Sequence, residues 1–410
     1  MRLRLLIRAL RHRNYRLFFA GQSISLIGTW MQRMAMNWLV YRLTGSPFLL
    51  GVVSFTGQAP TLVFTPIAGV IADNYDRHRL LTATQIMAMV QAAVIAVLVL
   101  TNIIAVWHLV LLSLLLGIVN AFDTPIRQSL VVEMIENRED LGNAIALNSS
   151  MVNGARLVGP SIAGMLIATV GEGMCFLLNA ISYVAVIIAL MAMTLAPKYS
   201  RATRPRIWQA WREGVTYAFG SLPIRSVLVL LAVVSFMGMP YATLLPIFAK
   251  EVLHGGAQTL GFLMGAAGIG ALTGAMFLAS RDDVPGLEAV LVVAAAIFGA
   301  GLIVFSLSRV FLLSCALMIL SGFGMMVHMA ASNTLVQTLV DDDKRGRVMS
   351  LYTMALRGMV PLGSLCAGAL ASYIGAPATL ALGGICCVLG GFAFASRRAV
   401  FKTPVIPHPQ

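Results

Sequence analysis

Long apolar segments alternate with short polar ones along the whole chain of 410 residues. Most of these segments approach or exceed the ~20 residues that a helix needs to cross the hydrocarbon layer of a membrane. The pattern therefore predicts an all-α integral membrane protein with twelve transmembrane helices. The predicted helices are residues 17–40, 48–72, 80–100, 109–122, 144–170, 174–195, 227–249, 260–279, 287–307, 311–335, 348–374 and 378–395.

Glycines of the fifth predicted helix recur in the eleventh. Three glycine pairs are each separated by 204 residues: Gly159 and Gly363, Gly164 and Gly368, Gly171 and Gly375. The spacing is half the chain length, which indicates two pseudo-symmetric six-helix bundles. We expect a basic leader (1–16), an N-terminal bundle (17–195), a connector (196–223), a C-terminal bundle (224–396) and a tail (397–410). The connector is interpreted either as a short helix on the membrane surface or as a solvated linker.

Composition and charge exclude a soluble protein. Hydrophobic residues make up 59% of the chain and charged residues 11%, whereas about a quarter of a soluble domain is charged. Of the 29 Lys and Arg residues, 23 lie on the side of the predicted helices that holds the N-terminus. Positive charge of this kind marks the cytoplasmic side. The net charge of +13 thus sets topology and does not indicate a nucleic-acid partner. We expect a multi-pass protein of the bacterial inner membrane with both termini cytoplasmic.

Ionisable residues inside the predicted helices are the best candidates for a site, because a charge within the bilayer is costly. Arg33, Arg156 and Arg357 are three such cations, and they predict an electropositive cavity for an anionic or oxygen-rich substrate such as a catecholate or carboxylate. The alternative is that each arginine is a structural strut bound to backbone carbonyls. The predicted cavity residues are Arg33, Asn37, Asn148, Asn153, Arg156 and Arg357.

Two further residues are candidates for carrying a proton. Asp123 is the one acid near the end of a predicted helix, and His328 is the one histidine well inside a predicted helix. Histidine titrates near neutral pH, although a packed core histidine is the alternative interpretation of His328. The fourth predicted helix, 109–122, contains no arginine, and Arg127 falls beyond its end.

The loop GVIADNYDRHR (69–79) resembles the loop signature of the major facilitator superfamily. In that family a glycine allows close helix approach, and an aspartate and arginines lock one gate. The resemblance implies that Gly69, Asp73, Arg77 and Arg79 are cytoplasmic gate residues. Asn74 and Asp76 depart from the family pattern, which implies a weaker lock.

The run Gly159-Pro160-Ser-Ile-Ala-Gly164 is similar to the glycine-proline signature of antiporters in the same superfamily. There it forms a tightly packed helix that seals against leak; the alternative is ordinary small-residue helix packing. The wider sequence, including 120–127, 143–148 and 175–179, resembles the secretion-effector branch, with the enterobactin exporter and macrolide efflux proteins.

This resemblance implies a secondary transporter, working as a monomer, that exports a small amphipathic molecule by alternating access. Proton antiport is implied by the family alone. A lysophospholipid or lipid flippase of the same fold and a substrate importer are the alternatives. An enzyme is not expected, and neither are a cofactor or a metal, because the sequence has no P-loop, no HExxH and no GxSxG.

Overall fold

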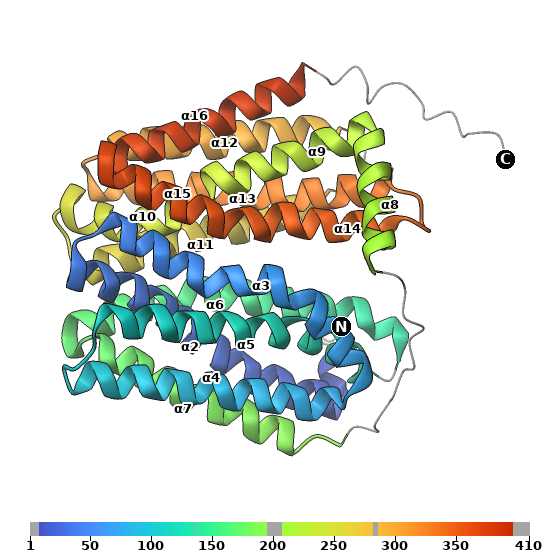
Figure 1. Ribbon diagram of the computed structural model, residues 1–410, viewed down its shortest axis with the longest axis horizontal. Helices are drawn as coiled ribbons and strands as arrows, with labels where there is room; N and C mark the ends of the chain where they lie inside the picture. Colours follow the sequence, from blue (N-terminus) through green and yellow to red (C-terminus); the bar gives the residue numbers. More distant parts are fainter. Residues whose placement is uncertain (1–7, 136, 195–206, 282–285, 397–410) are drawn as a thin grey trace. The chain divides into compact units, whose positions relative to one another are not determined.

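The computed structural model describes residues 8–135, 137–194, 207–281 and 286–396, and these residues form helices and no strand, as the pattern predicts (Figure 1). The predicted tail, residues 1–7 of the leader and residues 196–206 of the connector lie outside the described residues. The elements are η1 (Arg8–Arg11), α2 (Arg13–Thr44), α3 (Pro47–Asn74), α4 (Arg77–Leu100), α5 (Val106–Glu133), η2 (Arg138–Asp140), α6 (Leu141–Val170), α7 (Glu172–Met191), α8 (Ile207–Gly220), α9 (Leu222–Val233), η3 (Val234–Gly238), α10 (Tyr241–Ile247), η4 (Phe248–Val252), α11 (Ala257–Ala279), α12 (Leu287–Leu307), α13 (Phe311–Leu339), α14 (Arg345–Thr353), η5 (Met354–Gly358), α15 (Met359–Ile374) and α16 (Ala376–Ala395).

Eleven helical segments of the described chain are long and apolar enough to cross a membrane. Two of them contain π-helical turns: Leu222–Val252 joins α9 to η4, and Arg345–Ile374 joins α14 to α15. The twelfth is α2, whose 32 residues are ample in length but more polar. Its buried Gln22 and Gln32 are each only 3% exposed, so these two polar side chains face the protein interior.

The chain forms two compact units. The N-terminal unit contains Met1–Thr203 and Leu245–Gly268, and the C-terminal unit contains Arg204–Leu244 and Ile269–Gln410. The segment Leu245–Gly268, which the sequence analysis assigned to the second bundle, is grouped with the N-terminal helices. It includes η4 and the first half of α11.

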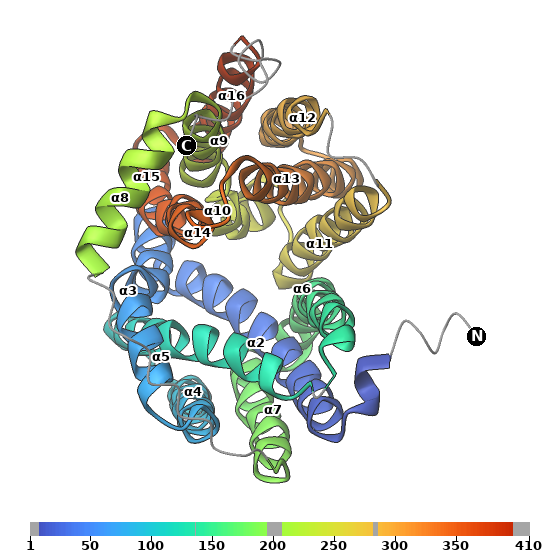
Figure 2. The same ribbon diagram turned by 90° about the vertical axis from the view of Figure 1, so that its right-hand side faces the viewer.

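Small residues let the helices of each unit approach closely. In the N-terminal unit α2 packs on α6 and α7, and α3 packs on α5 (Figure 2). An added Cβ at Gly117 of α5 would lie 2.7 Å from the carbonyl oxygen of Gly57 in α3. In the C-terminal unit α12 packs between α13 and α16. Such contacts are typical of membrane helices, whose association depends on close packing.

The glycine repeat has the same structural role in both units. Gly171 ends α6 with φ +88°, and Gly375 ends α15 with φ +82°, a conformation that favours glycine. Gly159 brings α6 against α2, where an added Cβ would lie 2.6 Å from the Cβ of Trp30. Gly363 likewise brings α15 against the backbone of Phe236 in η3. The fifth and eleventh membrane helices therefore pack on the first helix of their own half in the same way.

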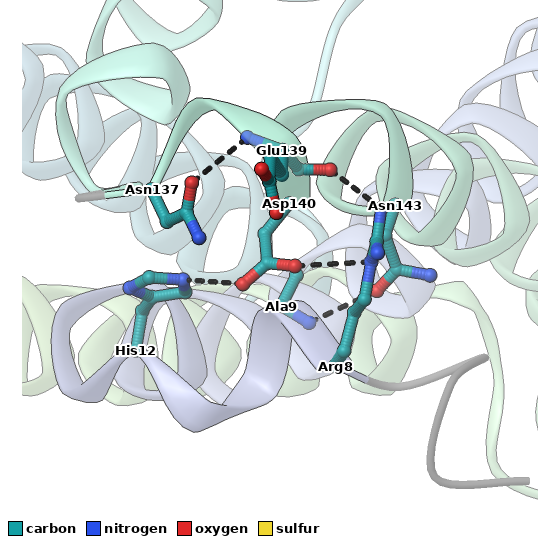
Figure 3. Close-up of polar contacts among 7 residues, drawn as sticks. All are labelled: Arg8, Ala9, His12, Asn137, Glu139, Asp140 and Asn143. Carbon is teal, nitrogen blue, oxygen red and sulfur yellow. Dashed lines mark hydrogen bonds and ion pairs between the residues drawn. The ribbon is translucent and has the colours of Figure 1, made fainter.

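The N-terminal turn is tied to the loop before α6 (Figure 3). Asp140 forms an ion pair with Arg8 and a hydrogen bond with His12 Nε2, each at 3.0 Å, and the backbone N–H of Ala9 donates to Asn143 Oδ1 at 2.9 Å. These contacts fix the beginning of α2 relative to α6, the two helices that carry the candidate site described next.

Candidate functional site

Two arginines of the N-terminal unit share one tryptophan ring. The guanidinium carbon of Arg33 lies 5.0 Å from the ring centroid of Trp30, and that of Arg156 lies 5.7 Å from it. Arg33 follows Trp30 by one turn of α2, whereas Arg156 comes from α6. Arg33 is exposed, and the other two side chains are partly buried. The sequence analysis predicted both arginines but missed Trp30, although its spacing to Arg33 places the two on one helix face.

This arrangement concentrates positive charge at mid-helix. The two ring distances together place the guanidinium carbons at most about 10.7 Å apart. At an effective dielectric constant of ~20 their repulsion is then at least about 1.5 kcal/mol. Cation–π attraction to the indole offsets part of this cost. A negatively charged ligand beside the ring would offset more.

The predicted asparagines lie near these cations along the same helices. Asn37 is one turn beyond Arg33 on α2, and Asn153 is one turn before Arg156 on α6. Asn153 donates to the backbone oxygen of Ser149 at 2.9 Å, and Asn148 is partly exposed further down α6.

Arg357 belongs to the C-terminal unit. It lies in the π-helical turn η5 and its side chain is exposed. Single π turns are rare and occur often at functional sites, so the backbone at Arg357 adds a feature that the sequence did not reveal. η5 contacts η3, a second π-helical turn of the same unit.

Asp123 is the centre of a buried polar cluster in the N-terminal unit. The carboxylate is 5% exposed and accepts hydrogen bonds from Thr84 at 3.2 Å and Gln85 at 2.5 Å. Arg127 pairs with it at 3.1 Å from one turn further along α5.

The fourth membrane helix is longer than the sequence predicted. The predicted end at residue 122 is wrong, because α5 continues to Glu133 through Pro125. The proline and the charged residues ended the apolar pattern, but the charges pair with each other and with neighbouring helices. Arg127 therefore lies inside this helix, and the prediction of a fourth helix without arginine is also wrong.

His328 has a different environment. Its side chain has no exposed surface, and it lies on α13 beside the backbone of Leu291 in α12. A proton would reach it only after movement of these tightly packed helices.

A chain of amides crosses the interior of the N-terminal unit. Asn179 of α7 donates to Gln32 of α2 at 2.7 Å, Gln32 donates to Gln91 of α4 at 2.9 Å, and Gln91 donates to the backbone oxygen of Leu112 in α5 at 3.1 Å. Buried polar groups are costly unless they are paired. This network pairs the amide of Gln32 in α2 and joins four helices.

The predicted gate segment, residues 69–79, covers the end of α3, the turn after it and the start of α4. Arg77 pairs with Glu133 of α5 at 2.6 Å and donates to the backbone oxygen of Ala72 at 2.9 Å. Asp76 caps α4 by accepting from the backbone N–H groups of His78 and Arg79, which gives this departure from the family pattern a structural role.

The other predicted gate residues differ from Arg77 in their surroundings. Arg79 is 87% exposed at its side chain and lies 3.5 Å from Asp76. An added Cβ at Gly69 would meet open space. Asp73 lies in the last turn of α3, and its side chain is outside what the structure describes.

The glycine-proline run of α6 packs on α11 within the N-terminal unit. An added Cβ at Gly164 would lie 2.9 Å from the backbone oxygen of Ala257, and one at Gly261 would lie 2.6 Å from that of Pro160. Gly265 faces Ser161 at a similar distance. Both helices therefore need small residues here.

We expect Gly261→Ala to destabilise this helix pair, because the new methyl group would meet backbone atoms that cannot rotate away. Overpacking of this kind costs about 1–3 kcal/mol. The measurement is the thermal unfolding midpoint of the purified protein, together with its transport activity. Gly154→Ala in α6 is the matched control, since an added Cβ there meets nothing within 4 Å. Equal midpoints for the two variants would contradict the close packing.

Polar contacts also join neighbouring elements near the ends of the membrane helices. At the end of α2 opposite the N-terminus, Arg42 pairs with Glu172 at 2.6 Å, and Tyr41 donates to Glu251 of η4. In the C-terminal unit, Glu213 of α8 pairs with Arg347 of α14 at 2.6 Å.

Tyr217 joins α8, which lies in the predicted connector, to the loop before α14. Its hydroxyl donates to Asp341 at 2.9 Å. Partial burial raises the pKa of the Tyr217 phenol above its ordinary value, so the hydroxyl keeps its proton, and this bond persists, at neutral pH.

Among the described residues, no group of three or more His, Cys, Asp or Glu side chains could hold a metal ion. The polar clusters found instead are ion pairs and amide networks.

Comparison with known proteins extends this description. The family model described as transmembrane secretion effector matches residues 7–403. A staphyloferrin A transporter of Staphylococcus aureus is 26% identical over 94% of this chain and 97% of its own length. Macrolide efflux protein A of Streptococcus pyogenes is 24% identical over 89% of this chain and 92% of its own. The enterobactin exporter of Shigella boydii is 24% identical over 83% and 81%.

The solved structures agree on the fold. A bacterial homologue of the human lysosomal transporter Spinster superposes with a TM-score of 0.73 at 14% identity, covering 96% of this chain and 99% of that one. This likeness confirms the major facilitator fold predicted from the sequence. With the family match over almost the entire chain, it shows that the protein is a membrane transporter of a small molecule, related to siderophore and drug exporters. The chain belongs to the transmembrane secretion effector family of the major facilitator superfamily.

Proposed function

We propose that this transporter exports a small amphipathic molecule, siderophore-like or drug-like, from the cytoplasm across the bacterial inner membrane. The observation that carries the proposal is the pair of arginines over Trp30. Charges at this depth are costly in a membrane helix and mark substrate pathways. The relatives support the direction, since two are named as an efflux protein and an exporter.

In this proposal the two halves rock about a central site. The cavity residues are Arg33, Asn37, Asn148, Asn153, Arg156 and Arg357. The gate residues Gly69, Asp73, Arg77 and Arg79 lie on the cytoplasmic side, as do both termini. Gly159 packs the fifth membrane helix on the first, and Pro160 and Gly164 pack it on the eighth, so that the helix seals against leak.

We further propose that export is coupled to inward proton flow. Asp123 is the preferred proton carrier over His328, because its carboxylate contacts three polar side chains, Thr84, Gln85 and Arg127, from two helices, whereas His328 is fully buried between helices. Arg127 holds the carboxylate and would release it on protonation, since a neutral acid no longer attracts the guanidinium.

The test is an accumulation assay in a deletion strain with and without a protonophore. We expect the deletion to raise intracellular levels of a catecholate or carboxylate siderophore, or of a macrolide, and the protonophore to produce the same rise in the parent strain. Lower levels in the deletion strain would indicate an importer. Lysophospholipid movement in reconstituted vesicles without any change in siderophores or macrolides would indicate a flippase.

A further inference from the structure

We propose that Trp30, Arg33 and Arg156 form a single binding site for an organic anion carrying at least two carboxylate groups. Each guanidinium binds one carboxylate, and the indole supports the carbon skeleton between them. The inference deepens the proposed export function and rests on it only for the identity of this anion as the transported molecule.

The positions of the two guanidinium groups suit a ligand with two carboxylates. Both guanidinium carbons lie within 5.7 Å of one ring centroid, so a molecule with carboxylates a few bonds apart can reach both. A guanidinium presents five N–H donors in a planar fork that matches a carboxylate. Each arginine also takes part in a further interaction, so the anion would bind alongside that partner.

The site is formed by two helices, α2 and α6, whose backbones pack closely. Gly159 of α6 lies against Trp30, where an added Cβ would be 2.6 Å from the tryptophan Cβ and 2.9 Å from the backbone oxygen of Ile27. The Cβ of Trp30 therefore has a fixed position relative to α6, which carries Arg156 three residues before Gly159. Such preorganisation lowers the cost of binding.

The three side chains are also accessible to a ligand. Arg33 is exposed, while Trp30 and Arg156 are only partly buried, so an anion can reach the donors without unfolding the helix pair. A purely structural role would be better served by full burial of the arginines against backbone oxygens. Partial exposure over an aromatic face is the arrangement that recognises a ligand.

The experiment measures tryptophan fluorescence of the purified full-length protein in nanodiscs during titration with citrate, with the neutral trimethyl citrate as the matched ligand control. The chain has five tryptophans. Trp107→Phe is the matched protein control, because Trp107 lies at the start of α5 and is 60% exposed. The test variants are Trp30→Phe, Arg33→Gln, Arg156→Gln and Arg156→Lys, and calorimetry measures their citrate affinity independently of fluorescence.

We expect a saturable fluorescence change with citrate in the wild type and in Trp107→Phe, and none in Trp30→Phe. Calorimetry should show at least tenfold weaker citrate binding in each glutamine variant and an intermediate loss in Arg156→Lys, which keeps the charge but not the fork. Thermal unfolding of each variant verifies that it is folded.

Three results would overturn the site: no saturable citrate binding to the wild type, equal citrate affinity in folded glutamine variants, or equal affinity for trimethyl citrate. These outcomes are separate from failure of the proposed function. Citrate binding at Trp30 without any accumulation defect in the deletion strain would refute export and leave the anion site. An accumulation defect without citrate binding would refute the anion site and leave export.

Discussion

Replacement of Arg156 by alanine is expected to abolish export while the protein remains in the membrane at the wild-type level. The change removes one of the two guanidinium groups over Trp30. A hydrogen bond to a charged group contributes about 1.5–3 kcal/mol, which corresponds to a loss of roughly tenfold to more than a hundredfold in affinity. The measurement is efflux from loaded cells, with membrane content determined by immunoblot.

The matched control is Arg309→Ala. Arg309 lies in the loop between α12 and α13, where it donates to the backbone oxygens of Ser306 and Ser308, and it takes no part in the proposed cavity. Its replacement should leave efflux unchanged. Wild-type efflux in Arg156→Ala would remove this arginine from the site, and a loss of membrane protein in that variant would assign it a structural role.

The helices could be predicted from sequence because membrane burial imposes a continuous apolar pattern. The ninth predicted helix, residues 287–307, coincides with α12, and most other ends differ by a few residues. The pattern failed at α5, where Pro125 and Arg127 interrupt it. These residues are tolerated because Arg127 pairs with Asp123, a contact that hydropathy does not reveal.

The partners of the candidate site residues could be predicted less well. Arg33, Arg156 and Asp123 stand out as charges in apolar segments. Their neighbours depend on which helix faces meet, and that is decided by packing, as where Gly159 admits Trp30. The amide network through Gln32, Gln91 and Asn179 also joins residues up to 147 positions apart, which no local pattern indicates.

Replacement of Asp123 by asparagine is expected to remove substrate-driven proton movement. Asparagine keeps an oxygen that can accept from Thr84 and Gln85, but it cannot bind or release a proton in the required range. Arg127 would also lose its partner, and breaking a buried ion pair costs up to about 3–5 kcal/mol. We therefore expect lower thermal stability as well, with Asp123→Asn combined with Arg127→Gln recovering stability because it leaves no unpaired charge.

The measurement uses proteoliposomes that contain a pH-sensitive dye and receive the substrate identified by the accumulation assay. Wild-type protein should move protons when substrate is added, and Asp343→Asn should behave like wild type, since Asp343 is an exposed loop residue paired with Lys344. Neither Asp123→Asn nor the stable double variant should move protons. Proton movement at the wild-type rate in the double variant would exclude Asp123 as the carrier. Because the double variant separates stability from coupling, a negative result in it reflects the missing carboxylate rather than a damaged fold.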